Sequence, residues 1–285
     1  MEKTLSLRGL VRISRPINLL LIAFAQGMTA HFLVETTTQG LPVLLDYSLY
    51  LLVLATSLVT AGGYMINDYY DVKIDYINRP KEVVVGKGIK RRMILVLHSV
   101  LNFAAIGLGG LVAPRIAALI FFTAVLLWWY CNKLKRKPFI GNVAVAFLTG
   151  LSIYLIGYHY QKNELFIFTY ALFAFFLNLI RELLKDLEDQ QGDHLHGSQT
   201  LPIVLGFRKT KQVIYVIAIV FVGAILTVTG LLNDTSLFIY FGALGIPFSW
   251  FMWKIYRADR REQFTQLSAF AKAIMLVGTL SMAFL

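Results

Sequence analysis

The sequence has few charged residues and a single cysteine, and each scarcity excludes a class of protein. Only 15% of its 285 residues are charged, whereas 57% are hydrophobic, and the mean hydropathy is +0.65. This composition is too apolar for a soluble domain of this size, so it predicts an integral membrane protein. The one cysteine, Cys131, excludes an intramolecular disulfide framework and a metal site built from several cysteines.

Acidic residues are scarcer than basic ones, with 16 Asp and Glu against 27 Lys and Arg, and the net charge is +11. A basic excess can indicate nucleic-acid binding. Here, however, the basic residues lie in short segments between apolar runs, which is the pattern of the positive-inside rule. The sequence therefore predicts the membrane bilayer, and no nucleic acid, as a partner.

Nine apolar runs predict nine membrane-spanning helices, because one span needs about 20 residues. The runs lie at 17–34, 43–66, 92–112, 115–132, 139–158, 165–184, 212–232, 236–256 and 268–285. No Pro/Ser-rich linker divides the chain, so we expect one transmembrane domain over residues 1–285. The predicted fold class is an all-α, polytopic integral membrane protein.

The distribution of basic residues predicts the orientation of the chain. If the N-terminus is cytoplasmic, the inside segments contain every Lys and Arg except Arg115, Lys162 and Lys272. The N-terminal segment lacks the pattern of a cleavable signal, and its basic residues are typical of a cytoplasmic anchor. We therefore expect a multi-pass protein of the cell (plasma or inner) membrane with a cytoplasmic N-terminus.

Although acidic residues are rare, two segments share the spacing D-x-x-D-x-x-x-D. The first, "NDYYDVKID", and the second, "KDLEDQQGD", each follow an apolar run, and both face the cytoplasm in the predicted orientation. On a helix, the three aspartates of each set lie within an arc of about 60°. The sets are Asp68, Asp71 and Asp75 in the first motif, and Asp186, Asp189 and Asp193 in the second.

The two stripes offer only oxygen ligands. Asn67 lies about 40° from Asp71 on the helix, and Glu182 lies about 40° from Asp186. Solvation of a helix end is the simpler explanation, but like charges at this spacing repel and oppose the helix dipole. A cation removes that repulsion, and oxygen-only ligation suits Mg²⁺. We therefore predict Mg²⁺ as cofactor, with Asn67 and the six aspartates as its ligands.

Two magnesium sites at a membrane surface indicate a diphosphate held between them, because metal ions neutralise the charge of this leaving group. Long apolar substrates that carry a diphosphate are mainly polyprenyl diphosphates. Their allylic C–O bond can ionise because the resulting cation is delocalised. The predicted substrate is therefore a polyprenyl diphosphate donor.

The chain resembles the UbiA superfamily of intramembrane prenyltransferases. The resemblance is carried by "RPINLL" at 15–20, by the two acidic motifs with their following "NRP" and "GSQTLP", and by "YCNKLKRKPFIGN" between them. Within the superfamily, "RELLKDLEDQQGD" and "KLKRKPFIGN" are most similar to the digeranylgeranylglyceryl phosphate synthase branch. The resemblance implies a cytoplasmic-side cavity ringed by helices, in which Mg²⁺ bridges the diphosphate and the aspartates, here expected to act as catalytic residues.

One segment departs from the family pattern. Arg79 and Pro80 are kept, but Glu82 and Val83 of "KEVVVGKG" stand where a second Arg-Pro is usual. Lys81 or Lys87 is the candidate to replace the missing contact with diphosphate.

Further candidates lie near the motifs. Basic residues that are candidates for diphosphate binding, with membrane topology as the alternative explanation, are Arg79, Lys133, Lys135 and Lys185. Other candidates, whose alternatives are helix–helix hydrogen bonds and an interfacial aromatic belt, are Asn18, Tyr130, Asn142 and Glu182. Lys272 is the one charged residue in the last apolar run. It is either functional or a lysine whose ammonium extends toward the membrane surface, and the sequence does not decide between the two.

The predicted function is Mg²⁺-dependent transfer of a polyprenyl group, expected to be geranylgeranyl, to the hydroxyl of a lipid acceptor such as geranylgeranylglyceryl phosphate. The alternative within the superfamily is an aromatic acceptor resembling 4-hydroxybenzoate, for quinone or chlorophyll-type products. A magnesium transporter would place polar residues deep in several spans, which are mostly apolar here. A non-catalytic prenyl-lipid binding protein is the remaining alternative.

Overall fold

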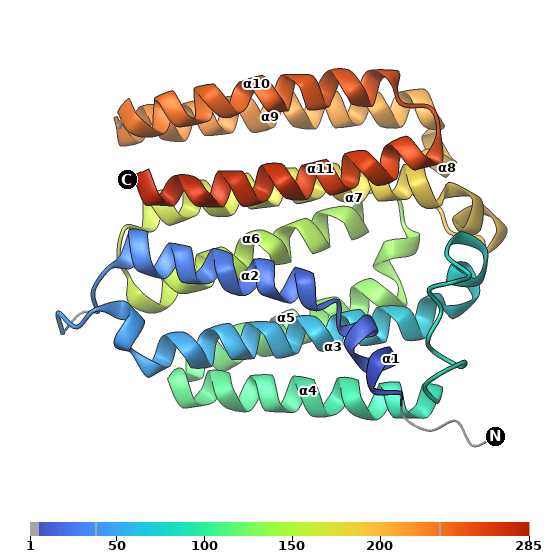
Figure 1. The fold of residues 1–285 in the computed structure, drawn as a ribbon, viewed down its shortest axis with the longest axis horizontal. Helices are drawn as coiled ribbons and strands as arrows, with labels where there is room; N and C mark the ends of the chain where they lie inside the picture. Colours follow the sequence, from blue (N-terminus) through green and yellow to red (C-terminus); the bar gives the residue numbers. More distant parts are fainter. Residues whose placement is uncertain (1–5, 38, 234, 285) are drawn as a thin grey trace.

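The computed structural model describes residues 6–37, 39–233 and 235–284, and these fold almost entirely into helices (Figure 1). Within this part of the chain, only two isolated bridges, Thr36 with Pro42 and Val85 with Ile89, have β geometry. The helices are α1 (Leu7–Ser14), α2 (Pro16–Met28), η1 (Thr29–Val34), η2 (Val43–Leu45), α3 (Tyr47–Asn78), α4 (Arg91–Val112), α5 (Pro114–Asn132), η3 (Leu134–Arg136), α6 (Ile140–Tyr160), α7 (Glu164–Leu195), α8 (Leu201–Leu205), α9 (Phe207–Leu232), α10 (Thr235–Arg257), α11 (Arg261–Leu280) and η4 (Ser281–Phe284).

Nine helices in the described residues are long and apolar enough to cross a membrane, which confirms the predicted fold class. They are α3 to α7 and α9 to α11, together with α2 and its π-helical continuation η1. All nine run along one axis, with α4 at one edge of the view and the hairpin of α9 and α10 at the other (Figure 1). The last span continues from α11 through η4.

Helix α7 is the central helix of the bundle. In its most apolar stretch 72% of the residues are buried, against 17% in α4 and in α5. One hydrophobic core surrounds α7 together with α9, α10 and α11, and a second fills the space between α2, α3, α5, α6 and the first half of α7. The acidic motif that ends α7 therefore extends from the best-packed element of the fold.

Helices α3 and α7 are longer than their apolar runs. The runs at 43–66 and 165–184 stop where the aspartate motifs begin, but the helices continue to Asn78 and Leu195. Each helix has 32 residues and is therefore about 48 Å long. Because the hydrocarbon core of a bilayer is about 30 Å thick, three further turns extend past it. Both aspartate motifs lie on these turns, as continuous helix.

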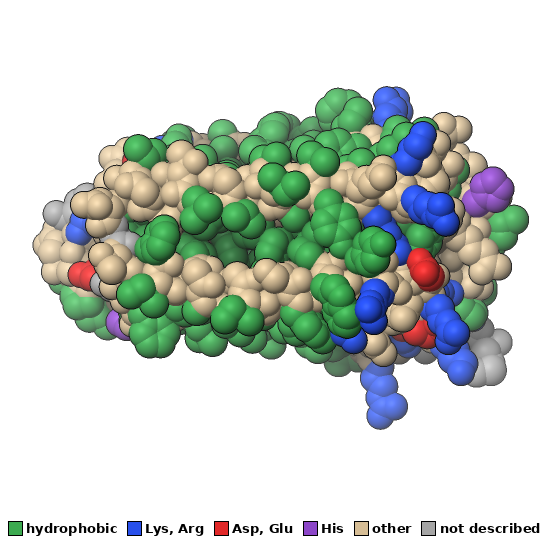
Figure 2. Space-filling view, turned by 90° about the horizontal axis from the view of Figure 1, so that it is seen from above, with side chains coloured by type: hydrophobic (Ala, Val, Ile, Leu, Met, Phe, Trp, Pro, Cys, Tyr) green, Lys and Arg blue, Asp and Glu red, His purple; other side chains and the backbone are tan. Residues whose placement is uncertain are grey.

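The two ends of the bundle differ in charge. Figure 2 shows hydrophobic side chains over most of the visible face and the Lys and Arg side chains gathered mainly toward one end. That end, which we call the motif end, holds the C-termini of α3 and α7, the segment 79–90, η3 and α8 (Figure 1). An apolar face with one charged end is the surface expected of a membrane-embedded bundle.

A short helix at the motif end was absent from the sequence prediction. Helix α1 begins after Ser6, whose hydroxyl accepts a hydrogen bond from the backbone N–H of Gly9. Its buried Ile13 packs with Val85 and Ile89 of the segment after the first motif. The N-terminal basic segment is therefore an amphipathic helix that covers one side of the motif end.

Candidate active site between helices α3 and α7

A cavity of about 250 Å³ lies between α2, α3, α5, α6 and α7, and both aspartate motifs contribute to its wall. Toward the motif end it is lined by acidic and basic side chains, and further along the helices by apolar ones. The charged lining residues are Arg15, Asp71, Asp75, Arg79, Lys135, Arg181, Glu182, Lys185, Asp186, Asp189 and Asp193. The apolar ones include Ile22, Val59, Leu119, Ile120, Leu127, Val145, Leu148, Leu151 and Leu155.

In the first motif, two of the three aspartates line the cavity. Asp71 and Asp75 do, as does Asn67, whereas Asp68 points to Arg15 and accepts a 2.8 Å hydrogen bond from its guanidinium. The carboxylate of Asp71 forms an ion pair with Lys135. The helical stripe predicted from the spacing is therefore present, with its first member turned toward a cation at the edge of the site.

In the second motif, all three aspartates line the cavity. Asp186 accepts a hydrogen bond from the side-chain amide of Asn142 at 2.9 Å, and Asp189 forms an ion pair with Arg79 at 3.1 Å. Asn142, which the sequence placed among the candidates, thus reaches the second motif from the start of α6. Asp193 faces Asp71 of the first motif closely enough for their charges to interact.

The third aspartates of the motifs, Asp75 and Asp193, have neither a hydrogen bond nor an ion pair from their side chains within the described residues. Over the same residues, no group of three or more Asp, Glu, His or Cys side chains is close enough to hold one metal ion. The seven predicted ligands therefore do not form one cluster in this structure. Three of the carboxylates are instead in ion pairs, with Arg15, Lys135 and Arg79.

The donor chemistry nevertheless fits magnesium. Mg²⁺ usually binds through one or two carboxylates, keeps several waters and takes its other ligands from substrate phosphates. Two free carboxylates, Asp75 and Asp193, line one cavity from different helices, and each lies close enough to Asp71 for their charges to repel without a cation. These two side chains would hold the metal, with the other aspartates as further oxygen donors.

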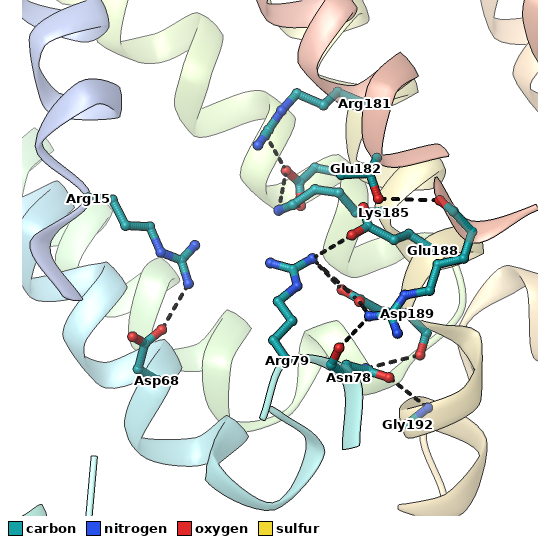
Figure 3. A network of polar contacts seen from close by, with 12 residues as sticks. Arg15, Asp68, Asn78, Arg79, Arg181, Glu182, Lys185, Glu188, Asp189 and Gly192 are labelled. Atoms are coloured by element: carbon teal, nitrogen blue, oxygen red, sulfur yellow. Dashed lines mark hydrogen bonds and ion pairs between the residues drawn. The ribbon is translucent and has the colours of Figure 1, made fainter. Parts of the chain in front are cut away.

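Asn78 fastens the two motif helices together, a role that the sequence analysis missed. Its amide donates to the backbone oxygen of Asp189 at 3.2 Å and accepts from the N–H of Gly192 at 3.0 Å (Figure 3). A Cβ atom at Gly192 would lie 2.5 Å from the Asn78 amide, so only glycine permits this approach. The guanidinium of Arg261, at the start of α11, donates to the Asn78 carbonyl oxygen at 2.5 Å.

Arg79 joins the motifs electrostatically. It follows α3 directly, lines the cavity and contacts both Asp189 and Glu188 of α7 (Figure 3). Burial alone would lower the pKa of Arg79, but the carboxylates of Asp189 and Glu188 outweigh burial and raise it. Arg79 therefore stays charged over the physiological pH range. Lys81 and Lys87, the candidates to replace the missing diphosphate contact, are exposed and lie outside the cavity wall.

Of the two candidate lysines near η3, only one reaches the cavity. Lys135 lines it and contacts both Asp71 and Asn67 of α3, whereas Lys133 is exposed and lies outside the wall. Gly141 makes this possible, because a Cβ there would lie 2.8 Å from the Leu134 carbonyl oxygen and from the Lys135 Cα. The turn after α5 can thus fold back tightly on α6.

Arg15 was not among the predicted site residues, although "RP" at 15–16 was part of the family resemblance. It occupies the left-handed region at φ 51° between α1 and α2, a conformation that costs a non-glycine residue about 1 kcal/mol. Burial lowers its pKa, but Asp68, Tyr64 and Asp75 together outweigh burial and raise it. The guanidinium also lies 4.8 Å from the centre of the Tyr64 ring.

A second charged group lies deeper in the cavity on α7. Glu182 is buried, accepts from Arg181 at 2.8 Å and from Lys185 at 3.0 Å, and therefore serves as their counterion (Figure 3). Tyr130 and Asn18 also line this cavity. Arg181 and Lys272, whose ammonium donates to the Asn18 side-chain oxygen at 3.0 Å, add positive charge that the motifs do not indicate.

Comparison with known proteins agrees with the fold. Residues 22–276 match the model of the UbiA prenyltransferase family, so the chain belongs to this family and is a prenyltransferase. Two similar relatives are digeranylgeranylglyceryl phosphate synthases, at 36% identity from Methanoregula boonei and 35% from Thermococcus gammatolerans. The first match covers 74% of this chain and 73% of the relative, and the second covers 73% of each.

Solved structures share the fold over nearly the whole chain. A structure of digeranylgeranylglyceryl phosphate synthase superposes with a TM-score of 0.75 and 22% identity, covering 99% of this chain and 98% of that one. A UbiA homolog from Archaeoglobus fulgidus, solved with DMAPP and Mg²⁺, gives a TM-score of 0.66 at 14% identity, covering 97% and 99%. These structures share the fold, and the match to the family model confirms the predicted superfamily.

Proposed function

We propose that the whole chain, as one transmembrane domain, transfers a geranylgeranyl group from its diphosphate to the hydroxyl of geranylgeranylglyceryl phosphate, with Mg²⁺ as cofactor. The observation that carries this proposal is that both aspartate motifs line one cavity whose wall, further along the helices, is largely apolar. The relatives named digeranylgeranylglyceryl phosphate synthase support the acceptor and the chain length. The solved homolog with DMAPP and Mg²⁺ supports the cofactor.

The charged end of the cavity suits the diphosphate. Lys135 and Arg79 both line the cavity, where they are paired with Asp71 and Asp189. Each cation can exchange its carboxylate for a diphosphate oxygen without leaving the cavity wall. Asp75 and Asp193 would hold Mg²⁺, which would neutralise the charge of the diphosphate.

The apolar end suits the prenyl chain. Side chains of Ile120, Leu148 and Leu155 continue the wall away from the motifs. Burying the chain stabilises the complex by about 0.8 kcal/mol per CH₂ group. The same wall keeps water from the allylic carbon, which would otherwise react with it.

In the reaction, the C–O bond between the allylic carbon and the diphosphate breaks, and its electron pair leaves with the diphosphate oxygen. The acceptor hydroxyl oxygen forms the new C–O bond with that carbon. Its proton passes to an aspartate that holds no metal or to water. Arg79 and Lys135 hold the departing diphosphate in place, which lowers the barrier only if they bind it more strongly as charge develops.

A prenyl-transfer assay in nanodiscs tests the proposal. Geranylgeranyl diphosphate is supplied with geranylgeranylglyceryl phosphate, with 4-hydroxybenzoate or with no acceptor, in Mg²⁺ or in EDTA. We expect Mg²⁺-dependent ether formation with the glyceryl phosphate, and a loss of about 100-fold or more in Asp71→Asn and Asp189→Asn. Glu262→Gln, an exposed acidic residue at the same end, should keep full activity. Transfer to 4-hydroxybenzoate alone would refute the acceptor.

A further inference from the structure

A second cavity of about 120 Å³ adjoins the first between α2, α7 and α11. Asn18, Tyr64 and Arg181 line both cavities, so the two meet at this level of the bundle. The second wall is mostly apolar, and its only charged members among the described residues are Lys272 and Arg181. A cavity with two cations and no anion in its wall is suited to a ligand that is itself negatively charged.

Lys272 lies eleven residues into the last spanning helix, about 16 Å from its start. Its ammonium donates to the neutral side chain of Asn18 at 3.0 Å, and within the described residues it forms no ion pair. A lysine inside a membrane span is destabilising unless a partner offsets its charge, and such residues usually mark a functional path. Asn18 alone leaves the charge of Lys272 without an anion.

The charges that face Lys272 do not supply this anion. They are Arg181, Lys185, Arg15 and Glu182. The single carboxylate, Glu182, is already shared by Arg181 and Lys185 at 2.8 and 3.0 Å, and Arg15 is paired with Asp68. Lys272, Arg181 and Lys185 therefore carry more positive charge than Glu182 can balance.

A second, independent observation points to the same ligand. The Nε atom of Arg181 is buried and has no hydrogen-bond partner, although its Nη1 binds Glu182 and Asn178. A buried donor without an acceptor costs about 1–3 kcal/mol, so such groups are rare unless a ligand completes them. Guanidinium and ammonium groups both form strong charge-assisted hydrogen bonds with phosphate oxygens.

We propose that Lys272 and the Nε atom of Arg181 bind the phosphate monoester of the acceptor lipid. The inference rests on the proposed function, and it assigns the two substrates to different levels of the bundle. Arg181 precedes Asp189 by eight residues on α7, which is about 12 Å along the helix. The donor diphosphate then lies at the motifs and the acceptor phosphate lies deeper, with the reacting hydroxyl between them.

The competing explanation is that Lys272 only fastens α11 to α2 through Asn18. A purely structural lysine would affect all ligands and folding alike. A phosphate-binding lysine affects only ligands that carry the phosphate. The two explanations therefore differ in the ratio between the affinities for geranylgeranylglyceryl phosphate and for its neutral alcohol, geranylgeranylglycerol.

The experiment measures equilibrium binding of these two lipids to the protein in nanodiscs made from zwitterionic lipid. We expect wild type to prefer the phosphate form at least tenfold. Lys272→Met should remove this preference while binding of the neutral alcohol and of the diphosphate donor is unchanged. Lys272→Arg should retain the preference, and Lys209→Met, at an exposed lysine, should behave as wild type.

Equal affinity of wild type for the two lipids overturns the proposal without any variant, even if Lys272→Met fails to fold. An unchanged ratio in folded Lys272→Met also overturns it. Competition experiments with glycerol 1-phosphate, inorganic phosphate and phosphatidic acid identify which phosphate the site binds. If phosphatidic acid displaces the bound lipid as strongly as the acceptor does, the assignment to the acceptor is refuted. Failure of the proposed function is seen separately, as absent Mg²⁺-dependent diphosphate release from the donor.

Discussion

Helices α3 and α7 carry the same acidic spacing and have the same length, but their aspartates have different partners. On α3, Asp68 and Asp71 are each paired with a cation, Arg15 and Lys135. On α7, the one hydrogen-bond partner of the Asp186 side chain among the described residues is the neutral amide of Asn142, and the cation paired with Asp189, Arg79, is shared with Glu188. Arg261 is more distant, at 3.8 Å. One pattern in the sequence therefore gives two electrostatically different half-sites.

The difference assigns different tasks to the two motifs. The first motif is already largely neutralised by cations that can turn to an incoming diphosphate. The second keeps more uncompensated negative charge and sits on the best-packed helix of the bundle. Because a divalent cation binds most strongly where negative charge is least compensated, we infer that the second motif binds magnesium more tightly than the first.

The largest expected effect comes from the two free carboxylates. Asp193→Asn should lower kcat/KM by about 100-fold or more and raise the Mg²⁺ concentration for half-maximal rate, because it removes an uncompensated ligand. Asp75→Asn should lower kcat/KM less and shift the Mg²⁺ dependence less. Steady-state kinetics over a Mg²⁺ titration measure both quantities. A larger shift in Asp75→Asn would reverse the assignment of the two motifs.

A smaller effect is expected at the contact that sets the distance between the helices. Gly192→Ala puts a methyl group against the hydrogen-bonded Asn78 amide, so we expect destabilisation of about 1–3 kcal/mol and a fall in activity. Gly223→Ala is the matched control, because this α9 glycine has open space around it and alanine favours helix. Thermal unfolding in detergent compares them, and equal stability would show that α7 tolerates a wider spacing.

The smallest of the three effects is expected at Arg79. Arg79→Gln should raise KM for the diphosphate donor about tenfold, because Arg79 is partly exposed and its hydrogen bond should contribute near the lower end of the usual range of about 1.5–3 kcal/mol for charged groups. Because its pKa is raised, Arg79 remains protonated below and well above neutral pH. The increase in KM caused by Arg79→Gln should therefore be the same from pH 6 to pH 9. Lys81→Gln, in the same segment but exposed, should leave KM unchanged. A loss confined to high pH would contradict this role.

The nine spans and the shared face of each motif could be predicted because they follow from local periodicity. The helix ends could not, since hydropathy falls at Asp68 and Asp186 while the helical stripe continues beyond them. Periodicity also could not show that Asp68 would turn toward Arg15, 53 residues away.

The contacts between elements were beyond the reach of the sequence for the same reason. Nothing in the local sequence distinguishes Asn78 and Gly192, because they meet only when two distant helices pack together. Lys133 and Lys135 are also alike in sequence, and the turn after α5 directs only Lys135 into the cavity. Long-range packing decides these positions, and no local pattern records it.

The continuous length of α3 and α7 has a consequence for where the protein works. Each helix is continuous, with an apolar part that spans the hydrocarbon core and an end beyond it that carries the carboxylates. When the hydrocarbon core of the bilayer is thinner than the apolar part is long, such a helix tilts, at a modest free-energy cost per ångström of mismatch. Because the hydrogen bonds of Asn78 to Asp189 and Gly192 join the two helices beside the carboxylates, a tilt that strains this contact changes the gap between the carboxylates. We therefore expect the thickness of the surrounding membrane to act as a regulator of turnover.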